Sequence, residues 1–461
     1  MERKGDSATG ALGLVRHGPF ARLWWAGLAS SFGDWVALFA TIALADAIGG
    51  VTGILVPLTA RMLPGLFGAA AGVLADRFNR KVTMVVCDAG RALLVVSLVF
   101  VRTLPELFLV SFAMEVLALF WGPSREASIP NLVPKKVLVR ANSLSLVAVY
   151  GTLPVGSAAF SIFAGISELT NVLGAFGSNT GLAFVVDSAT FIFSASLIAT
   201  IPIPRPEVSK DRMARGRLDW KLPFRDVMDG IRFILRERSV RSVIVGIATA
   251  LFGAGIFFAL GQPFSSSVLN AGSSGFGILI TALGSGVGLG MIGLSAMGMS
   301  DFRRDVAFSL SLVATGLTIT AAALSRTIAG AAFWALLAGA GAGSSYVMGF
   351  THLHEQVTDE LRGRTFAALY TLTRTALLIS ITAAAFVAAI LDGKLPGIFS
   401  SGIRSALVLG GVVVAFAGAI TLWNMRKTFS RPHIPEEALR TFEDASDTFT
   451  EIRGRRRKER E

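Results

Sequence analysis

Long apolar segments alternate with short polar ones along almost the whole chain. A helix rises 1.5 Å per residue, so about 20 apolar residues cross the hydrocarbon core of a bilayer. The pattern predicts an all-α membrane protein with twelve transmembrane helices in two pseudo-symmetric six-helix halves. The predicted spans, the fourth given by its core, are residues 23–48, 53–75, 82–101, 107–121, 143–166, 182–203, 243–263, 275–298, 306–324, 329–350, 365–391 and 403–423.

The polar segments divide the chain into five parts. Within the linker, apolar residues at helical spacing over 218–238 predict a helix that lies along the membrane surface. The two halves show a weak internal repeat, because the charged residues 301–304 follow the eighth span in the same position as residues 76–80 follow the second. The parts are a cytoplasmic leader at 1–22, the N-terminal half at 23–204, a cytoplasmic linker at 205–241, the C-terminal half at 242–425 and a basic cytoplasmic tail at 426–461.

Composition and charge give the expected orientation. The mean hydropathy of +0.62 and the 16% of charged residues are those of a membrane protein. The net charge is +12, and the basic residues gather in one set of loops and at both ends, which predicts that these face the cytoplasm. We therefore expect a multi-pass protein of the cell (inner) membrane with both termini cytoplasmic. The basic loops and the tail favour anionic lipid headgroups as contacts, and nucleic acid is not expected.

The segment between the second and third spans carries the most specific motif. Residues 72–81 read Gly-Val-Leu-Ala-Asp-Arg-Phe-Asn-Arg-Lys, a short basic connection that predicts a tight cytoplasmic hairpin. It resembles the signature loop of the major facilitator superfamily, G-x-L-A-D-R-x-G-R-K, with Asn79 in place of the second glycine. Asp88 and Arg91 further resemble the macrolide-exporter and enterobactin-exporter branch. The other segments that carry this resemblance are 20–24, 33–35, 130–134, 140–142 and 360–364.

The resemblance implies efflux from the cytoplasm by alternating access, driven by the proton gradient. It also implies that the signature loop controls conformation by holding the two halves together. Asp76 would then face the N-terminal end of the eleventh helix, where the helix dipole favours an anion. The fifth span matches the glycine–proline pattern of proton-coupled antiporters only in part. The residues assigned to conformational gating are Gly72, Asp76, Arg77, Arg80, Lys81, Asp88, Arg91, Arg362 and Arg364.

Charged residues within the predicted spans are the candidates for substrate and proton binding. An ionised group at the bilayer centre costs about 2.5–3.5 kcal/mol on insertion scales, so such groups pair, face a cavity or serve function. Asp34 is the favoured proton carrier, with Arg61 as a possible fixed partner. Arg374 is favoured for gating or for an anionic group. The whole candidate cavity set is Asp34, Arg61, Glu115, Asp187, Arg374 and Tyr370.

These charges admit two interpretations. They could bind a cationic or zwitterionic amphiphile, with Asp34 or Glu115 exchanging protons. They could instead form salt bridges between helices that break and reform as the halves rock. The sequence does not separate these roles.

Soluble catalysis is not indicated. The sequence lacks the G-x-x-x-x-G-K-[ST] phosphate loop, and the glycine-rich 284–290 lies inside a predicted span without a preceding strand. We expect no enzyme activity, cofactor or metal site. The favoured function is a monomeric antiporter that exports a lipophilic drug or siderophore and confers multidrug resistance. The alternatives are a lipid or lysolipid flippase on the same fold and a non-transporting membrane receptor or scaffold.

Overall fold

The computed structural model describes residues 11–67, 78–134, 137–169, 180–203, 228, 231–232, 234–295, 301–356 and 359–429. All regular structure in these ranges is helical. Eleven helices in the described part of the chain are long and apolar enough to cross a membrane. The predicted all-α membrane fold is therefore confirmed. The predicted second span is described only in its first part, because residues 68–77 lie outside the described ranges.

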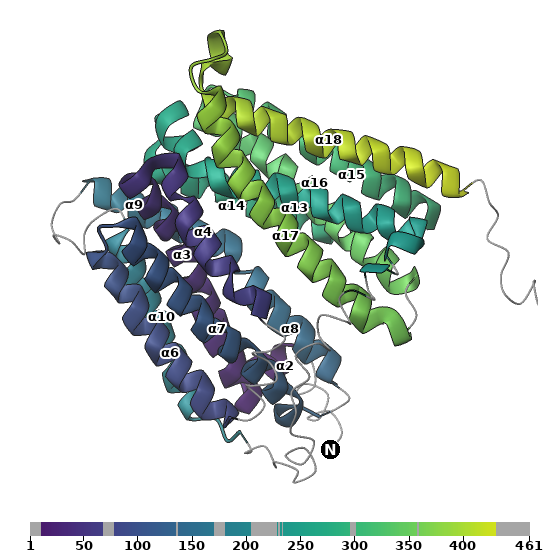
Figure 1. Cartoon of the computed structure of the whole chain (residues 1–461). Coiled ribbons are helices and arrows are strands. Elements are labelled where there is room, and N and C mark those ends of the chain that lie inside the picture. Colours follow the sequence, from purple (N-terminus) through teal and green to yellow (C-terminus); the bar gives the residue numbers. More distant parts are fainter. Residues whose placement is uncertain are drawn as a thin grey trace, which may run out of the picture.

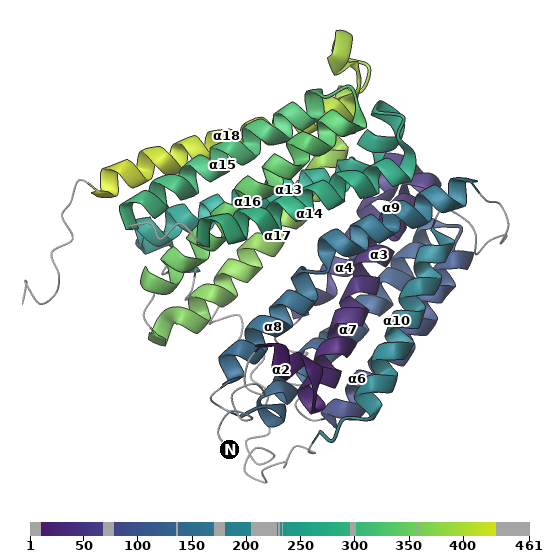
Figure 2. The ribbon, with the colours of Figure 1, turned by 180° about the vertical axis from the view of Figure 1, so that it is seen from behind.

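The helices form two groups that follow the order of the chain (Figures 1 and 2). The first group comprises α2 (Ala11–Arg16), α3 (Pro19–Gly53), α4 (Leu55–Met62), η1 (Pro64–Phe67), α6 (Arg80–Ser97), η2 (Leu98–Phe100), α7 (Leu104–Leu132), α8 (Leu138–Tyr150), α9 (Leu153–Leu169) and α10 (Gly181–Ala199). The second group comprises α13 (Arg238–Pro263), the π-helix η5 (Phe264–Val268), α14 (Gly272–Ser295), α15 (Asp301–Leu324), α16 (Ile328–Gln356), α17 (Asp359–Leu391), η6 (Gly397–Ser400) and α18 (Gly402–Phe429).

Local sequence explains where several helices begin and break. The side chain of Asn79 accepts hydrogen bonds from the backbone N–H groups of Lys81 and Val82 and so caps α6. Thr103 and Glu106 form a capping box at the start of α7. The second predicted span is not one helix, since α4 ends before Pro64 and continues as the short η1.

The fourth membrane helix is longer than predicted. The prolines and basic residues of 122–142 predict a segment on the cytoplasmic surface, but α7 continues to Leu132 through Pro123 and Pro130. Arg125, expected at that surface, is 6% exposed and lies against Gly27 of α3. The prediction is wrong for residues 122–132, because the helix continues through both prolines and the guanidinium group of Arg125 is packed against α3 and Trp121 instead of facing water. The predicted surface helix at 218–238 lies mostly outside the described residues.

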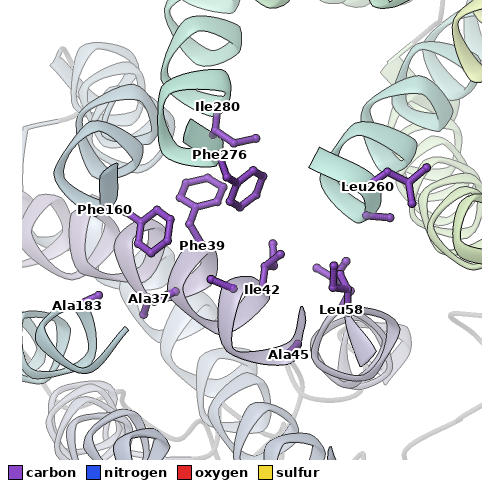
Figure 3. Packing of buried hydrophobic residues seen from close by; sticks show 14 of the residues in the cluster. Ala37, Phe39, Ile42, Ala45, Leu58, Phe160, Ala183, Leu260, Phe276 and Ile280 are labelled. Carbon is purple, nitrogen blue, oxygen red and sulfur yellow. The ribbon is translucent and has the colours of Figure 1, made fainter. Parts of the chain in front are cut away.

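The two groups pack against each other through an aromatic core. Phe39 of α3 stacks on Phe258 of α13 and meets the edge of Phe276 of α14, with ring centroids 6.3 and 5.8 Å apart. Phe160 of α9 also contacts Phe276 edge to face (Figure 3). All of these rings except Phe258 are fully buried. Aromatic pairs of this geometry contribute about 0.5–1.5 kcal/mol beyond the area they bury, so this core is a main contact between the groups.

Hydroxyl contacts extend the same interface. Ser161 of α9 donates to the carbonyl of Ser274 over 2.7 Å, and the hydroxyls of Ser157 and Thr281 lie 3.1 Å apart. Nearby, the Ser266 hydroxyl donates to the carboxylate of Asp46 on α3 over 3.4 Å. These contacts lie near one end of the bundle, close to the start of α14.

The interface ends partway along α14. Gly277, Thr281, Gly284 and Gly288 share one face of this helix by their spacing of three to four residues. A methyl group added to Gly277 or Gly284 would lie 2.5 or 2.3 Å from a side-chain atom of α9, whereas one added to Gly288 would meet nothing within 4 Å. The two groups therefore separate along α14, and both views show them diverging toward the end that carries α2 (Figures 1 and 2).

A pair of matched substitutions tests this interface. Gly277→Ala and Gly288→Ala gain the same helix propensity, roughly 1 kcal/mol each. Only Gly277→Ala places a methyl against the backbone of Ser161, so overpacking by about 1–3 kcal/mol should lower its stability relative to Gly288→Ala. Thermal unfolding of the purified variants measures the difference. Equal melting temperatures would show that α9 and α14 do not pack as described.

Candidate functional site

The first candidate site lies where α3, α6 and α10 meet. Gly33 of α3 allows this close approach, because a methyl group there would lie 2.1 Å from Asp187 Oδ1 and 2.2 Å from Thr190 Oγ1 of α10. Asp187, Thr190 and Ser194 follow one face of α10 at helical spacing and form a polar stripe. Gly33 thus brings the carboxylate of Asp34, the next residue, to the side of α6.

Four ionisable side chains meet at this point, and we name Asp34, Asp88, Arg91 and Asp187 the α3–α6–α10 charge cluster. Arg91 of α6 donates from Nη2 to Asp34 Oδ1 over 2.5 Å and lies 4.1 Å from the centre of the Phe191 ring. The Ser194 hydroxyl of α10 donates to Asp88 Oδ2 of α6 over 2.6 Å. The cluster therefore links three membrane helices through charged hydrogen bonds.

Charge in this cluster is unbalanced. Three carboxylates face one guanidinium group within it, and Asp88 and Asp187 are 0% exposed. The side chain of Asp34 is 26% exposed, so it is the member of the cluster that water reaches most easily. The Thr190 hydroxyl donates to Asp187 Oδ1 over 3.1 Å, but Asp187 Oδ2 has no hydrogen-bond partner among the described residues. Ionised carboxylates buried without full compensation cost several kcal/mol each, so this arrangement favours binding of a cation or a proton.

A second charge group lies apart from this cluster and includes residues from both helix groups. Arg61 Nε of α4 and Glu115 Oε2 of α7 are 3.9 Å apart, and the two side chains are 24% and 27% exposed. Arg374 of α17 donates from Nη1 to the carbonyl of Gly65 in η1 over 2.9 Å. Gly65, which Arg374 contacts, lies four residues after Arg61 in the chain, and on this ground we name Arg61, Glu115 and Arg374 the interbundle charge group. The expected pairing of Arg61 with Asp34 is wrong, because Arg91 takes that carboxylate and Arg61 faces Glu115.

The residues predicted for gating are only partly described. Arg80 donates to the carbonyl of Ala127 over 2.8 Å and so joins α6 to α7, and Lys81 lies in the first turn of α6. Asp88 and Arg91 join Asp34 in one cluster, so the expected division into gating and cavity residues does not separate these three. Gly72, Asp76 and Arg77 lie outside the described residues, as do the side chains of Arg362, Arg364 and Tyr370.

Two further polar residues within the membrane helices were not singled out from the sequence. Arg125 is buried on α7, where it lies 5.7 Å from the Trp121 ring centre and donates to the Ser145 carbonyl over 3.4 Å. Asp46 contacts the second helix group through Ser266. Asp46 could have been identified from the sequence, because a charge within an apolar span is costly. Arg125 could not, because its segment was assigned to the membrane surface.

Long apolar helices in two groups, with charged residues within the spans, are the features of a multi-pass membrane transport protein. The chain belongs to the Transmembrane secretion effector family of major facilitator (MFS) transporters, whose model matches residues 9–444. Membership of the macrolide-exporter and enterobactin-exporter branch stays a prediction.

Curated relatives agree with this assignment over part of their length. The uncharacterized MFS-type transporter YkuC of Bacillus subtilis (strain 168) is 28% identical over 246 residues, which cover 50% of this chain and 53% of that protein. YfiS of the same organism, also an uncharacterized MFS-type transporter, is 31% identical over 123 residues, 25% of this chain and 28% of YfiS. The matched regions thus span about half or less of these relatives.

Solved structures show the same fold at low identity. A bacterial homolog to the human lysosomal transporter Spinster, inward-facing and unoccupied, has a TM-score of 0.66 and 14% identity. That match covers 88% of this chain and 97% of the homolog. The nucleoside transporter NupG has a TM-score of 0.64 and 13% identity, over 88% of this chain and 99% of NupG.

Two serines of α10 test the geometry of the charge cluster. Ser194 is buried and donates to Asp88, whereas Ser196 is exposed and bonds only its own helix at Ile192. Ser194→Ala should lower the free energy of unfolding by about 1–3 kcal/mol, because it removes a hydrogen bond from a buried carboxylate. Ser196→Ala should leave it nearly unchanged. Denaturant or thermal unfolding compares the two, and similar values would place Ser194 away from Asp88.

Proposed function

We propose that this protein is a proton-coupled secondary transporter that exports a lipophilic small molecule by alternating access. The observation that carries the proposal is the α3–α6–α10 charge cluster, where three carboxylates surround one arginine inside a membrane-spanning bundle. A group of this kind can hold a proton in one state and release it in another as its ion pairs change. Membership of the family supports transport as the function, and the charge cluster supports the proton as the coupling ion.

Within this proposal, Asp34 exchanges the proton. It is the most exposed carboxylate of the cluster, and it makes the direct ion pair with Arg91. Protonation of Asp34 would weaken that pair and free Arg91 for the other carboxylates of the cluster. A proton would thereby change the contacts that hold α3, α6 and α10 together.

Alternating access supplies the conformational part. The two helix groups meet through the aromatic core and the first part of α14. They diverge toward the end of the bundle that carries α2. In secondary transporters the halves rock around a site near the bilayer midplane. We propose that the diverging end faces the cytoplasm, which agrees with the predicted cytoplasmic position of the basic loops. The protein would then be open to the cytoplasm in this state, ready to load its substrate.

A flippase for lipids or lysolipids is the second candidate. The observation that favours it is the interbundle charge group, since arginines and a glutamate together match the charges of a zwitterionic headgroup. Transport of lysolipid without dependence on a pH gradient would favour this candidate over proton-coupled export.

Removing the carboxylate of Asp34 tests the proposed proton coupling. In proteoliposomes with an imposed pH gradient, the wild-type protein should transport at least one of ethidium, erythromycin and octyl phosphate. Asp34→Asn should abolish the part of transport that depends on the gradient, because the amide neither binds nor releases a proton. Fluorescence or radiolabel counting of the vesicles measures the rate.

Glu237→Gln is the matched control, since Glu237 is exposed at the start of α13 and makes no capping bond. It should transport like the wild type. Gradient-driven transport that persists in Asp34→Asn would exclude Asp34 as the proton carrier. Absence of any gradient-driven transport by the wild type, for all three probes, would contradict the proposed function itself.

A further inference from the structure

The interbundle charge group includes a direct contact between the two helix groups. Arg374 comes from the second group, and its contact at Gly65 belongs to the first. Arg374 is exposed although it lies within the apolar span Thr371–Leu391. Contact of an arginine with acyl chains would cost about 2.5–3.5 kcal/mol or more of insertion free energy. The exposed surface of Arg374 is therefore better placed toward water between the two helix groups.

The net charge of this group is positive, and not all of its N–H donors are engaged in hydrogen bonds. The group contains two guanidinium groups and one carboxylate, and no carboxylate lies within ion-pair distance of Arg374 among the described residues. The 3.9 Å between Arg61 and Glu115 is longer than a hydrogen bond. Each guanidinium group carries five N–H donors, and Arg374 uses one nitrogen on the Gly65 carbonyl. Both arginines therefore retain donors for an anionic group.

Apolar surface adjoins the charges. Phe108 and Phe112 precede Glu115 on the same face of α7, by seven and three residues, and their rings stack with centroids 5.8 Å apart. Phe112 is 36% exposed. On the other side of Glu115, seven residues along, a methyl group added to Gly122 would meet nothing within 4 Å. The face thus has open space and an aromatic surface beside its positive charge.

We propose that the interbundle charge group binds the phosphate or carboxylate of an amphiphilic anion, whose apolar part lies along α7. Planar guanidinium groups pair with such oxyanions through two parallel hydrogen bonds, which a cationic or neutral head cannot form. The inference rests on the proposed transport function, because it assigns the substrate class of that transporter. It also assigns a role to Glu115, whose carboxylate competes with the substrate for Arg61.

The binding of octyl compounds to the full-length protein tests this site. The protein is placed in nanodiscs of phosphatidylcholine, and octyl phosphate, octanoate, octyltrimethylammonium and inorganic phosphate are titrated by calorimetry without any gradient. Octyl phosphate and octanoate should bind, and octyltrimethylammonium should not. Arg374→Ala should weaken binding of the anions about tenfold or more, because a charge-assisted hydrogen bond is lost.

Two further variants separate binding from folding. Arg326→Ala removes an exposed arginine in the connection between α15 and α16 and should leave binding unchanged. Glu115→Gln should tighten binding of octyl phosphate several-fold, because it removes the competing negative charge. A folding defect cannot produce that gain. Addition of phosphatidate to the nanodiscs distinguishes the source: competition identifies a lipid headgroup, and its absence identifies a soluble amphiphile.

Tight binding of octyltrimethylammonium, or octyl phosphate affinities that are equal in the wild type, Arg374→Ala and Glu115→Gln, would overturn the inference. If those results accompanied gradient-driven transport of ethidium or erythromycin, the inference would fail while the transport function stood. Selective anion binding without gradient-driven transport would instead contradict the proton coupling and leave the site in place.

Discussion

The cost of holding charge inside an apolar bundle determines how this protein is built. In the α3–α6–α10 charge cluster, Arg91 compensates Asp34 directly, and Ser194 supplies a hydrogen bond to Asp88. Burial of these groups requires the three helices to stay in close contact, which Gly33 makes possible. The same requirement leaves more negative charge than one guanidinium group balances, so the region that fixes the helices is also the region best suited to respond to protons.

The two charge groups divide the chemistry between them. The α3–α6–α10 charge cluster lies within the first helix group and carries surplus negative charge, whereas the interbundle charge group joins both groups and carries surplus positive charge. In the proposed transport cycle, a change of protonation in the first would change the electrostatic field at the second, which is one physical route from proton binding to substrate release.

The sequence predicted the fold well and the pairing of charges poorly. Apolar length alone identified the membrane helices, because that property is local and repeats along the chain. It also indicated Asp34, Arg61, Glu115, Asp187 and Arg374 as costly residues. The partner of each depends on which helices become neighbours, and that is a tertiary property: Arg91, 57 residues from Asp34 in the chain, lies beside it in the structure. The burial of Arg125 likewise follows from packing that no short segment determines.

The glycine face of α14 has a mechanical consequence. Gly277 and Gly284 present no side chain to α9, so Ser161 and Leu153 of α9 pack directly against the backbone of α14 at these two positions. Hydrogen bonds at Ser157–Thr281 and Ser161–Ser274 join the two helices. At these two positions α14 has no side chain that reorientation of α9 would have to displace. In the proposed alternating access, the glycine face of α14 would therefore be a contact about which the two groups reorient, next to the aromatic core around Phe39.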